Sequence, residues 1–327
     1  MTETQRLKPD ELGLRRAAEI LRTGGLVAFP TETVYGLGGD ARSTGAVDAI
    51  YRAKERPPTN PLIVHVAEPG QAARYGRLSA EAERLAEAFW PGPLTLVVPR
   101  REGAGLAAAA CAGLPTVALR IPANATAIEL LRGFGGPIAA PSANRSGRVS
   151  ATSAAHVLEG LADRIAAVID AGPTDLGIES TILACAPDGV RLLRQGAIPQ
   201  ERIEALLARP VRADGETGPV RAPGQLASHY APRARLRLSA TQPRPGEAWL
   251  ALGPVPPGVT GPALSLSRGG DLSEAAANLF AHLRALDAAI GGRGIIAVSQ
   301  IPDAGIGRAI NDRLSRAAAP RPSVEPE

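Results

Sequence analysis

Short apolar runs alternate with segments of helical periodicity along the first 208 residues. Ala17, Ala18 and Leu21 share one face of a helix that Asp10 can cap, and the apolar run 26–30 follows it as a buried strand. The same alternation predicts helices at 43–54, 79–89 and 199–207 and strands at 62–66, 94–98, 116–121, 138–140, 166–170, 180–183 and 190–193. This pattern is typical of an α/β fold with one large sheet.

Regular periodicity is lost after residue 208 and returns near residue 234, because prolines and glycines interrupt the segment between them. Beyond it the pattern predicts strands at 235–238, 248–252 and 295–298 and helices near 276–283 and 308–314. We therefore expect four parts: a large α/β domain at 1–208, a linker at 209–233, a small α/β domain at 234–316 and a flexible tail at 317–327.

Composition excludes several classes of protein. Of the 327 residues 45% are hydrophobic, yet no run reaches the roughly 18 apolar residues of a membrane helix. The first ten residues are polar, so we expect a cytoplasmic protein without membrane contact. Cys111 and Cys185 fit neither a disulfide framework nor a zinc pair and are interpreted as buried apolar thiols. Dinucleotide and Walker-type glycine motifs are missing, and no zinc, flavin or nicotinamide is expected.

Hydroxyls and glycines follow the first expected strand directly. The segment 31–38 reads Thr-Glu-Thr-Val-Tyr-Gly-Leu-Gly, and open α/β sheets commonly bind ligands where such a strand ends. A simple glycine turn is the alternative. The density of hydrogen-bonding side chains between apolar elements favours a ligand loop.

Two cations and three prolines lie between an expected helix and the next strand, in the segment 54–61. Lys54 and Arg56 in a stiffened loop suit a phosphate, although a solvated helix end would also favour cations. The chain has 36 basic residues, and its only lysines are Lys8 and Lys54. A lysine retained at this position favours the phosphate interpretation.

Small polar residues follow another apolar strand. The segment 140–147 reads Ala-Pro-Ser-Ala-Asn-Arg-Ser-Gly, with Ser150 shortly beyond. Backbone amides and hydroxyls in such a turn can bind an anion, whereas a capped turn before the next helix explains the pattern equally well. His65 taken alone is interpreted as a hydrogen-bonded structural histidine. No residue is assigned to a metal.

Together, the segments 30–37, 54–65 and 141–147 resemble in order and spacing the motifs of the YrdC/Sua5 family. Segments 177–181 and 228–232 extend the resemblance to the longer, two-domain Sua5 form. This form implies a large twisted-sheet YrdC-like domain, a linker that closes over the active site and a small Rossmann-like Sua5 domain.

The resemblance implies the activity of a threonylcarbamoyl-AMP synthase, a nucleotidyltransferase. L-Threonine, bicarbonate or CO2 and ATP would give threonylcarbamoyladenylate and pyrophosphate, with Mg2+ accompanying ATP. The product would serve threonylcarbamoyladenosine formation in tRNAs that read codons beginning with A. Expected partners are therefore the downstream tRNA threonylcarbamoyl transferase machinery and, through a weak contact, tRNA.

The resemblance also implies roles for individual residues. Lys54 and Arg56 would act in catalysis by offsetting charge on the phosphates, and Arg120 would bind the threonine carboxylate bidentately. The expected ATP-binding residues are Lys54, Arg56, Asn60, Thr116, Ser142, Asn144, Ser150, Arg194, His229 and Tyr230. The expected threonine-binding residues are Thr33, His65, Arg120, the backbone of Ala140, and Ser180.

Two other functions stay open at this point. An RNA-binding protein without catalysis would fit the pI of about 9.5, but aromatic residues amount to only 3% and no basic stripe is visible. A carbamoyl-transfer enzyme of the hydrogenase-maturation type would use the same catalytic domain type. Such an enzyme should bring zinc-type cysteine pairs and further domains, which this sequence lacks.

Overall fold

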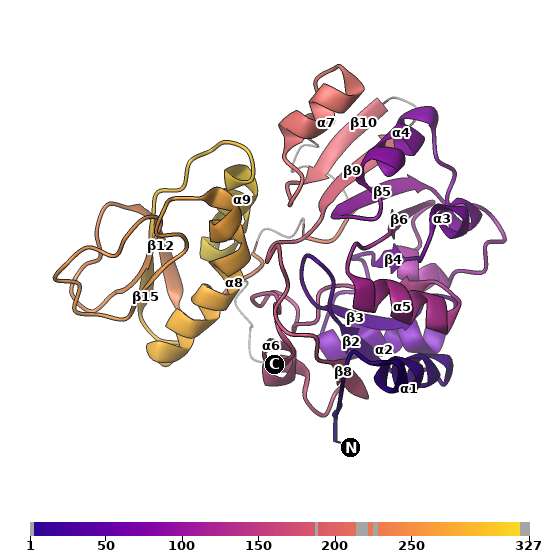
Figure 1. Ribbon diagram of the computed structural model, residues 1–327, viewed down its shortest axis with the longest axis horizontal. Coiled ribbons are helices and arrows are strands. Elements are labelled where there is room, and N and C mark those ends of the chain that lie inside the picture. The colour runs from indigo at the N-terminus through magenta and orange to yellow at the C-terminus, as the bar shows by residue number, and fades with distance from the viewer. Residues whose placement is uncertain (1–2, 187–188, 214–221, 225–227, 321–327) are drawn as a thin grey trace. The chain divides into compact units, whose positions relative to one another are not determined.

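A computed structural model describes residues 3–186, 189–213, 222–224 and 228–320 (Figure 1). The chain forms two compact units. The first unit comprises 1–146, 151–175 and 179–225, and the second comprises 147–150, 176–178 and 226–327. The division differs from the expected boundary at residue 208, because the described part of the linker at 209–213 and 222–224 belongs to the first unit.

The first unit is built on an 11-stranded mixed sheet, with the order β1-β8-β2-β3-β7-β4-β6-β5-β9-β10-β11. Its strands are β1 (Gln5–Leu7), β2 (Val27–Phe29), β3 (Gly36–Asp40), β4 (Ile63–His65), β5 (Leu94–Pro99), β6 (Thr116–Arg120), β7 (Ile138–Ala139), β8 (Ala167–Ile169), β9 (Thr181–Ala186), β10 (Gly189–Arg194) and β11 (Arg212–Ala213). Its helices are α1 (Glu11–Arg22), α2 (Thr44–Lys54), α3 (Pro69–Tyr75), α4 (Ala80–Phe89), the 3-10 helix η1 (Ala108–Cys111), α5 (Ala125–Phe134), α6 (Ala154–Leu161) and α7 (Gln200–Leu207).

Helix caps explain where several of these helices begin. The carboxylate of Asp10 accepts a hydrogen bond from the backbone N–H of Gly13 at 2.8 Å, and the hydroxyls of Ser43 and Ser79 cap α2 and α4 in the same way. Such caps satisfy an N–H that the first helical turn leaves without a partner. The helices and strands expected in the first 208 residues are all present.

One face of the sheet is covered along its length. Alternate residues of the strands, such as Val64, Leu96 and Leu119, pack in one core with residues of α2, α4, α6 and α7. Figure 1 shows α7 beside β10 and α4 near β5. This core excludes a ligand site from the face that it covers.

The opposite face is covered unevenly. Helices α1 and α5 pack on its β8-β2-β7 part, through residues such as Leu21 and Leu131. The β4-β6-β5-β9-β10 part carries a separate small cluster that contains strand residues and Ala222, and none of the described helices contributes to it. This half-covered face is where side chains from several strands can meet a ligand.

Residues 36–40 differ from the sequence prediction. The sequence predicts a loop through Gly38, but Gly36–Asp40 is strand β3, paired between β2 and β7. A Cβ on Gly38 would lie 2.8 Å from the ring of Phe29 and 2.9 Å from the side chain of Ile138. Gly38 is therefore needed because the side chains of Phe29 and Ile138 pack directly on its backbone, and not because the chain turns there.

The second unit contains a four-stranded, wholly parallel sheet with the order β12-β15-β13-β14, together with helices α8 and α9. Its elements are β12 (Arg235–Ala240), β13 (Ala248–Ala251), β14 (Ala263–Ser265), α8 (Leu272–Ala289), β15 (Ile295–Ser299) and α9 (Gly307–Ala318). The small α/β domain is thus confirmed. The predicted tail begins too early, because α9 continues through Ala318, and residues 321–327 lie outside the described part of the chain.

Candidate functional site

Predicted site residues line the half-covered face of the first unit. Ile63 and Ala118 belong to its small cluster, so His65 and Arg120, each two residues further along a strand, point to the same side. His65 and Arg120 are direct partners in the parallel pairing of β4 with β6. Thr116 begins β6, so its Cα lies about 13 Å from that of Arg120 at a rise of roughly 3.3 Å per residue.

The three loops singled out by the sequence meet in the first unit. The N–H of Leu37 donates to the carbonyl of Pro141 at 2.8 Å, and Gly36 forms a bridge with Ser142. The ammonium of Lys54 donates to the carbonyls of Ser142 and Asn144. Segments 31–38, 54–61 and 140–147 therefore form one site, with Lys54 joining two of them.

Lys54 is almost fully buried at the end of α2. Burial, followed by the positive charge of Arg56, lowers the pKa of the Lys54 ammonium well below the usual value for lysine. Since burial and Arg56 both disfavour the charged form of Lys54, an anionic ligand bound nearby would stabilise that form. The Lys54 side chain also holds the 142–144 loop in place through its two hydrogen bonds. The sequence did not predict this structural role.

Arg56 and Asn60 form the second part of the cationic region. The guanidinium of Arg56 donates to the Asn60 carbonyl at 3.1 Å, to the Asn60 side-chain oxygen at 2.6 Å and to the Pro61 carbonyl at 2.9 Å. The amide nitrogen of Asn60 is buried and has no hydrogen-bond partner among the described residues. A ligand acceptor would satisfy this donor.

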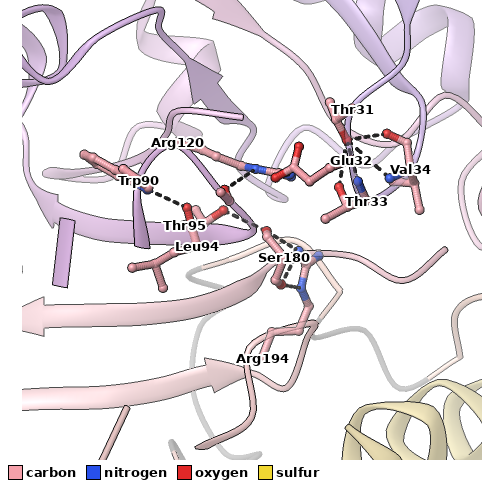
Figure 2. Close-up of polar contacts among 11 residues, drawn as sticks. Thr31, Glu32, Thr33, Val34, Trp90, Leu94, Thr95, Arg120, Ser180 and Arg194 are labelled. Atoms are coloured by element: carbon pink, nitrogen blue, oxygen red, sulfur yellow. Dashed lines mark hydrogen bonds and ion pairs between the residues drawn. The ribbon is translucent and has the colours of Figure 1, made fainter. Parts of the chain in front are cut away.

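A second group of contacts joins β5, β9 and β10 (Figure 2). Arg194, at the end of β10, donates to the Ser180 carbonyl at 2.9 Å and to the Ser180 hydroxyl at 3.0 Å. The same hydroxyl lies 2.8 Å from the hydroxyl of Thr95. Another nitrogen of Arg194 donates to the carbonyl of Pro223, in the described piece of the linker, at 3.2 Å.

A buried ion pair forms the third group. Arg120 donates to one carboxylate oxygen of Glu32 at 2.6 Å, and both side chains are buried. A bidentate grip on a ligand carboxylate uses two guanidinium nitrogens, and Glu32 occupies one of them in this structure. The Thr31 hydroxyl, 2.8 Å from that of Thr33, donates to the Val34 carbonyl at 2.7 Å and fixes the loop that carries Glu32.

His65 is a neutral histidine. Burial, and next the positive charge of Arg120, lower the pKa of His65 to about 3. Its Nδ1 is buried without a hydrogen-bond partner in the described part of the chain, and its ring lies edge-on to Phe29 at 6.1 Å between centroids. Nδ1 can therefore hydrogen-bond a ligand. The interpretation of His65 as a structural histidine, whose ring is fully hydrogen-bonded within the protein, did not include this possibility.

Three predicted ATP-binding residues belong to the second unit. Ser150 lies in 147–150, and the N–H of Ala231 donates to the carbonyl of Gly147 at 2.9 Å. Tyr230 is buried, stacks on Phe280 at 5.7 Å and lies under the guanidinium of Arg313 at 4.9 Å, while the rings of His229 and Tyr230 are 4.0 Å apart. The segment that carries Ser150 thus contacts, through Gly147, the segment that carries His229 and Tyr230.

Sequence reasoning missed Glu32 and Thr95 as site residues. Glu32 stood inside a motif but received no role. Thr95 is the single polar residue of the apolar run 94–98 and is fully buried. A lone hydroxyl in a buried strand needs a hydrogen-bond partner, and this signal could have identified it.

Cys111 and Cys185 are free and buried, as expected, and burial raises the pKa of the Cys185 thiol to about 12. Within the described residues no group of three or more histidine, cysteine or acidic side chains could bind a metal ion. No described helix is both long enough and apolar enough to cross a membrane.

Gly196, two residues after the end of β10, permits the close approach of its segment to the backbone at Ser180. A Cβ there would lie 2.3 Å from the nitrogen of Thr181 and 2.4 Å from the carbonyl carbon of Ser180. We expect Gly196→Ala to lower the free energy of unfolding by about 1–3 kcal/mol, because backbone atoms must move apart. Urea denaturation measures the change.

The matched control is Gly133→Ala in α5, where a Cβ would meet nothing within 4 Å. This substitution should be neutral or stabilising, since alanine favours a helix over glycine. Equal stability of Gly196→Ala and the wild-type protein would contradict the close approach.

The first unit defines an α/β protein whose candidate ligand site combines buried cations with buried hydroxyls. Residues 19–196 match the Sua5/YciO/YrdC family, described as "Telomere recombination". Residues 198–319 match the C-terminal domain of threonylcarbamoyl-AMP synthase. The chain belongs to the Sua5/YciO/YrdC family, as the three motifs predicted, and to its two-domain form, as segments 177–181 and 228–232 predicted.

Relatives match over nearly the full length. Threonylcarbamoyl-AMP synthase of Bacillus subtilis is 40% identical over 97% of this chain and 96% of its own. The crystal structure of P. abyssi Sua5 complexed with L-threonine has a TM-score of 0.88 at 37% identity, covering 97% of this chain and 98% of that one. Full-length HypF reaches a TM-score of 0.50 at 21% identity over 56% of this chain and 29% of its own, which shows the fold alone.

Proposed function

We propose that this protein is a threonylcarbamoyl-AMP synthase, a nucleotidyltransferase that converts L-threonine, bicarbonate or CO2 and ATP into threonylcarbamoyladenylate and pyrophosphate. The observation that carries the proposal is the meeting of the three motif loops through Lys54 and the 140–147 segment. Names of full-length relatives and the threonine bound to P. abyssi Sua5 support it.

The proposed threonine site lies around Arg120, Thr33 and His65. Arg120 offers a buried positive charge to the substrate carboxylate. Ser180, which precedes β9, accepts a hydrogen bond from Arg194 and would contact threonine, so one hydroxyl connects this site to an arginine of the proposed ATP site. Such direct contact would hold two substrates in fixed relative positions.

The proposed reaction asks little covalent chemistry of the protein. The bound threonine ammonium first loses a proton to solvent, and the neutral amine then takes up CO2 and releases a second proton. An oxygen of the resulting carbamate attacks the α-phosphorus and displaces pyrophosphate. Lys54 and Arg56 would offset the charge that develops on the phosphates. Mg2+ would arrive with the triphosphate and offset further charge, because the described residues gather no acidic cluster for it.

The linker would act as a lid that keeps water from the mixed anhydride. Support comes from its described piece, where Ala222 joins the apolar cluster of the half-covered face and Pro223 accepts from Arg194. Residues 214–221 and 225–227 of the predicted lid lie outside the described residues.

Pyrophosphate release tests the function. We expect the purified protein to release pyrophosphate only when ATP, L-threonine and bicarbonate are all present, with rapid-quench mass spectrometry detecting the adenylate. Release that ignores threonine would contradict the proposal. RNA affinity measured over a salt series tests the RNA-binding alternative, since tight binding without pyrophosphate release would favour it.

The product is proposed to serve threonylcarbamoyladenosine formation in tRNAs that read codons beginning with A, through a tRNA threonylcarbamoyl transferase. The mixed anhydride is reactive toward amines, which is the chemistry that such a transferase needs. Transfer from enzyme-made adenylate to tRNA, in a coupled assay, measures this step.

A further inference from the structure

Glu32 is the one acidic side chain in the 31–38 loop, and only 8% of its side chain is exposed. One carboxylate oxygen, Oε1, accepts from Arg120 at 2.6 Å. The other, Oε2, is fully buried and has no hydrogen-bond partner among the described residues. Half of a buried carboxylate is therefore left unsatisfied.

A buried charged oxygen without a donor is costly. Hydrogen bonds to charged groups are stronger than those between neutral groups, and a carboxylate away from water is destabilising unless its oxygens are paired. Arg120 satisfies one oxygen and leaves the other available.

The free oxygen lies within the set of residues proposed to bind threonine. The side chain of Glu32 reaches from the loop that carries Thr31 and Thr33 to the guanidinium of Arg120 (Figure 2). Arg120 in turn is paired in register with His65, whose buried Nδ1 also has no partner among the described residues. Two residues that contact or pair in register with Arg120 therefore each carry a buried atom without a partner among the described residues.

A free amino acid carries two opposite charges that are separated by one carbon. Arg120 supplies a cation for the carboxylate, and Glu32 supplies an anion on the same buried pair. A ligand with both charges would complement both partners and leave the site without net change in charge. A carboxylate ligand alone would complement Arg120 and leave Oε2 unsatisfied.

We propose that Glu32 binds the α-ammonium group of the amino acid substrate through Oε2, while Oε1 holds Arg120 in place for the carboxylate. The role rests on the proposed function. It assigns the recognition of the amine to a residue that neither the motifs nor the family match identified.

Glu32→Gln tests the role, because glutamine keeps the shape and one acceptor oxygen but removes the charge. Isothermal titration without nucleotide or Mg2+ compares L-threonine with 2,3-dihydroxybutanoate of the same stereochemistry, in which a hydroxyl replaces the amine. We expect Glu32→Gln to weaken threonine binding by roughly ten- to a hundredfold. Binding of 2,3-dihydroxybutanoate should change by less than about threefold, as no charged pair is lost there.

Glu247→Gln is the matched control, because Glu247 is also buried and paired with an arginine, Arg237 at 2.9 Å, but belongs to the second unit. It should leave both affinities unchanged. Equal weakening of both ligands by Glu32→Gln would overturn the amine contact and leave Glu32 as a support for Arg120 alone. Tighter threonine binding would show that Glu32 competes with the ligand carboxylate, which also overturns the proposal.

The wild-type protein separates this inference from the proposed function. Wild-type protein that binds threonine and releases pyrophosphate, combined with an unchanged ligand preference in Glu32→Gln, rejects only the role of Glu32. Wild-type protein that neither binds threonine nor releases pyrophosphate rejects both. Thermal unfolding of each variant confirms that the compared proteins are folded.

Discussion

Lys54→Ala is expected to lower kcat/KM for threonine-dependent pyrophosphate release by about 10²–10³-fold, as the loss of a preorganised electrostatic donor does elsewhere. The ammonium is buried between loops and donates to the carbonyls of Ser142 and Asn144. Alanine removes a cation from the proposed phosphate site and leaves two carbonyls without their donor. Steady-state pyrophosphate release over a range of ATP concentrations measures the effect.

Lys8→Ala is the matched control, because Lys8 is the other lysine of the chain and is exposed. It should retain wild-type activity. Lys54→Met separates charge from volume: it fills the space but donates no hydrogen bond, and should resemble alanine in activity. Wild-type kcat/KM in both Lys54 variants would contradict the assignment.

Much of the fold was predictable because local signals agree with the tertiary structure. The Asp10 and Ser43 caps and the alternating apolar runs predict α1, α2 and the central strands correctly. Strand β3 was not predictable in this way. Its glycines carry no strand pattern, and they are explained only by the side chains of Phe29 and Ile138 from neighbouring strands.

The boundary between the units shows a second limit. Residues 147–150 follow a loop of the first unit in sequence but belong to the second unit. Their neighbours there, Ala231 and Arg284, lie more than 80 residues further along the chain. Local periodicity contains no information about such a partner, so the contacts of 147–150 with the second unit were not predicted.

Motif order predicted the site better than the chemistry of single residues did. The three loops meet as their shared resemblance implied, but the sequence alone did not show that Lys54 would bind loop carbonyls. From the sequence, Arg120 was expected to bind a ligand carboxylate, and no partner within the protein was predicted for it. In the structure Arg120 forms an ion pair with Glu32. Pairing between residues 88 positions apart depends on the sheet register, which only the structure supplies.

Arg120→Met is expected to abolish detectable threonine binding and to lower the free energy of unfolding by about 3–5 kcal/mol. Threonine binding is lost because the guanidinium proposed to bind the threonine carboxylate is gone. The free energy of unfolding falls because Glu32 would stay buried as a carboxylate with neither oxygen paired among the described residues. Urea denaturation and isothermal titration measure the two effects separately.

The double variant Arg120→Met with Glu32→Gln distinguishes these causes. Removing the stranded charge should recover a large part of the lost stability, since replacing both members of a buried ion pair is far less costly than removing one. Threonine binding should not return, because the guanidinium is still missing. If Arg120→Met alone were as stable as the wild-type protein, another group would have to neutralise Glu32. If the double variant were no more stable than Arg120→Met, the instability would come from lost packing of the arginine side chain and not from the unpaired carboxylate.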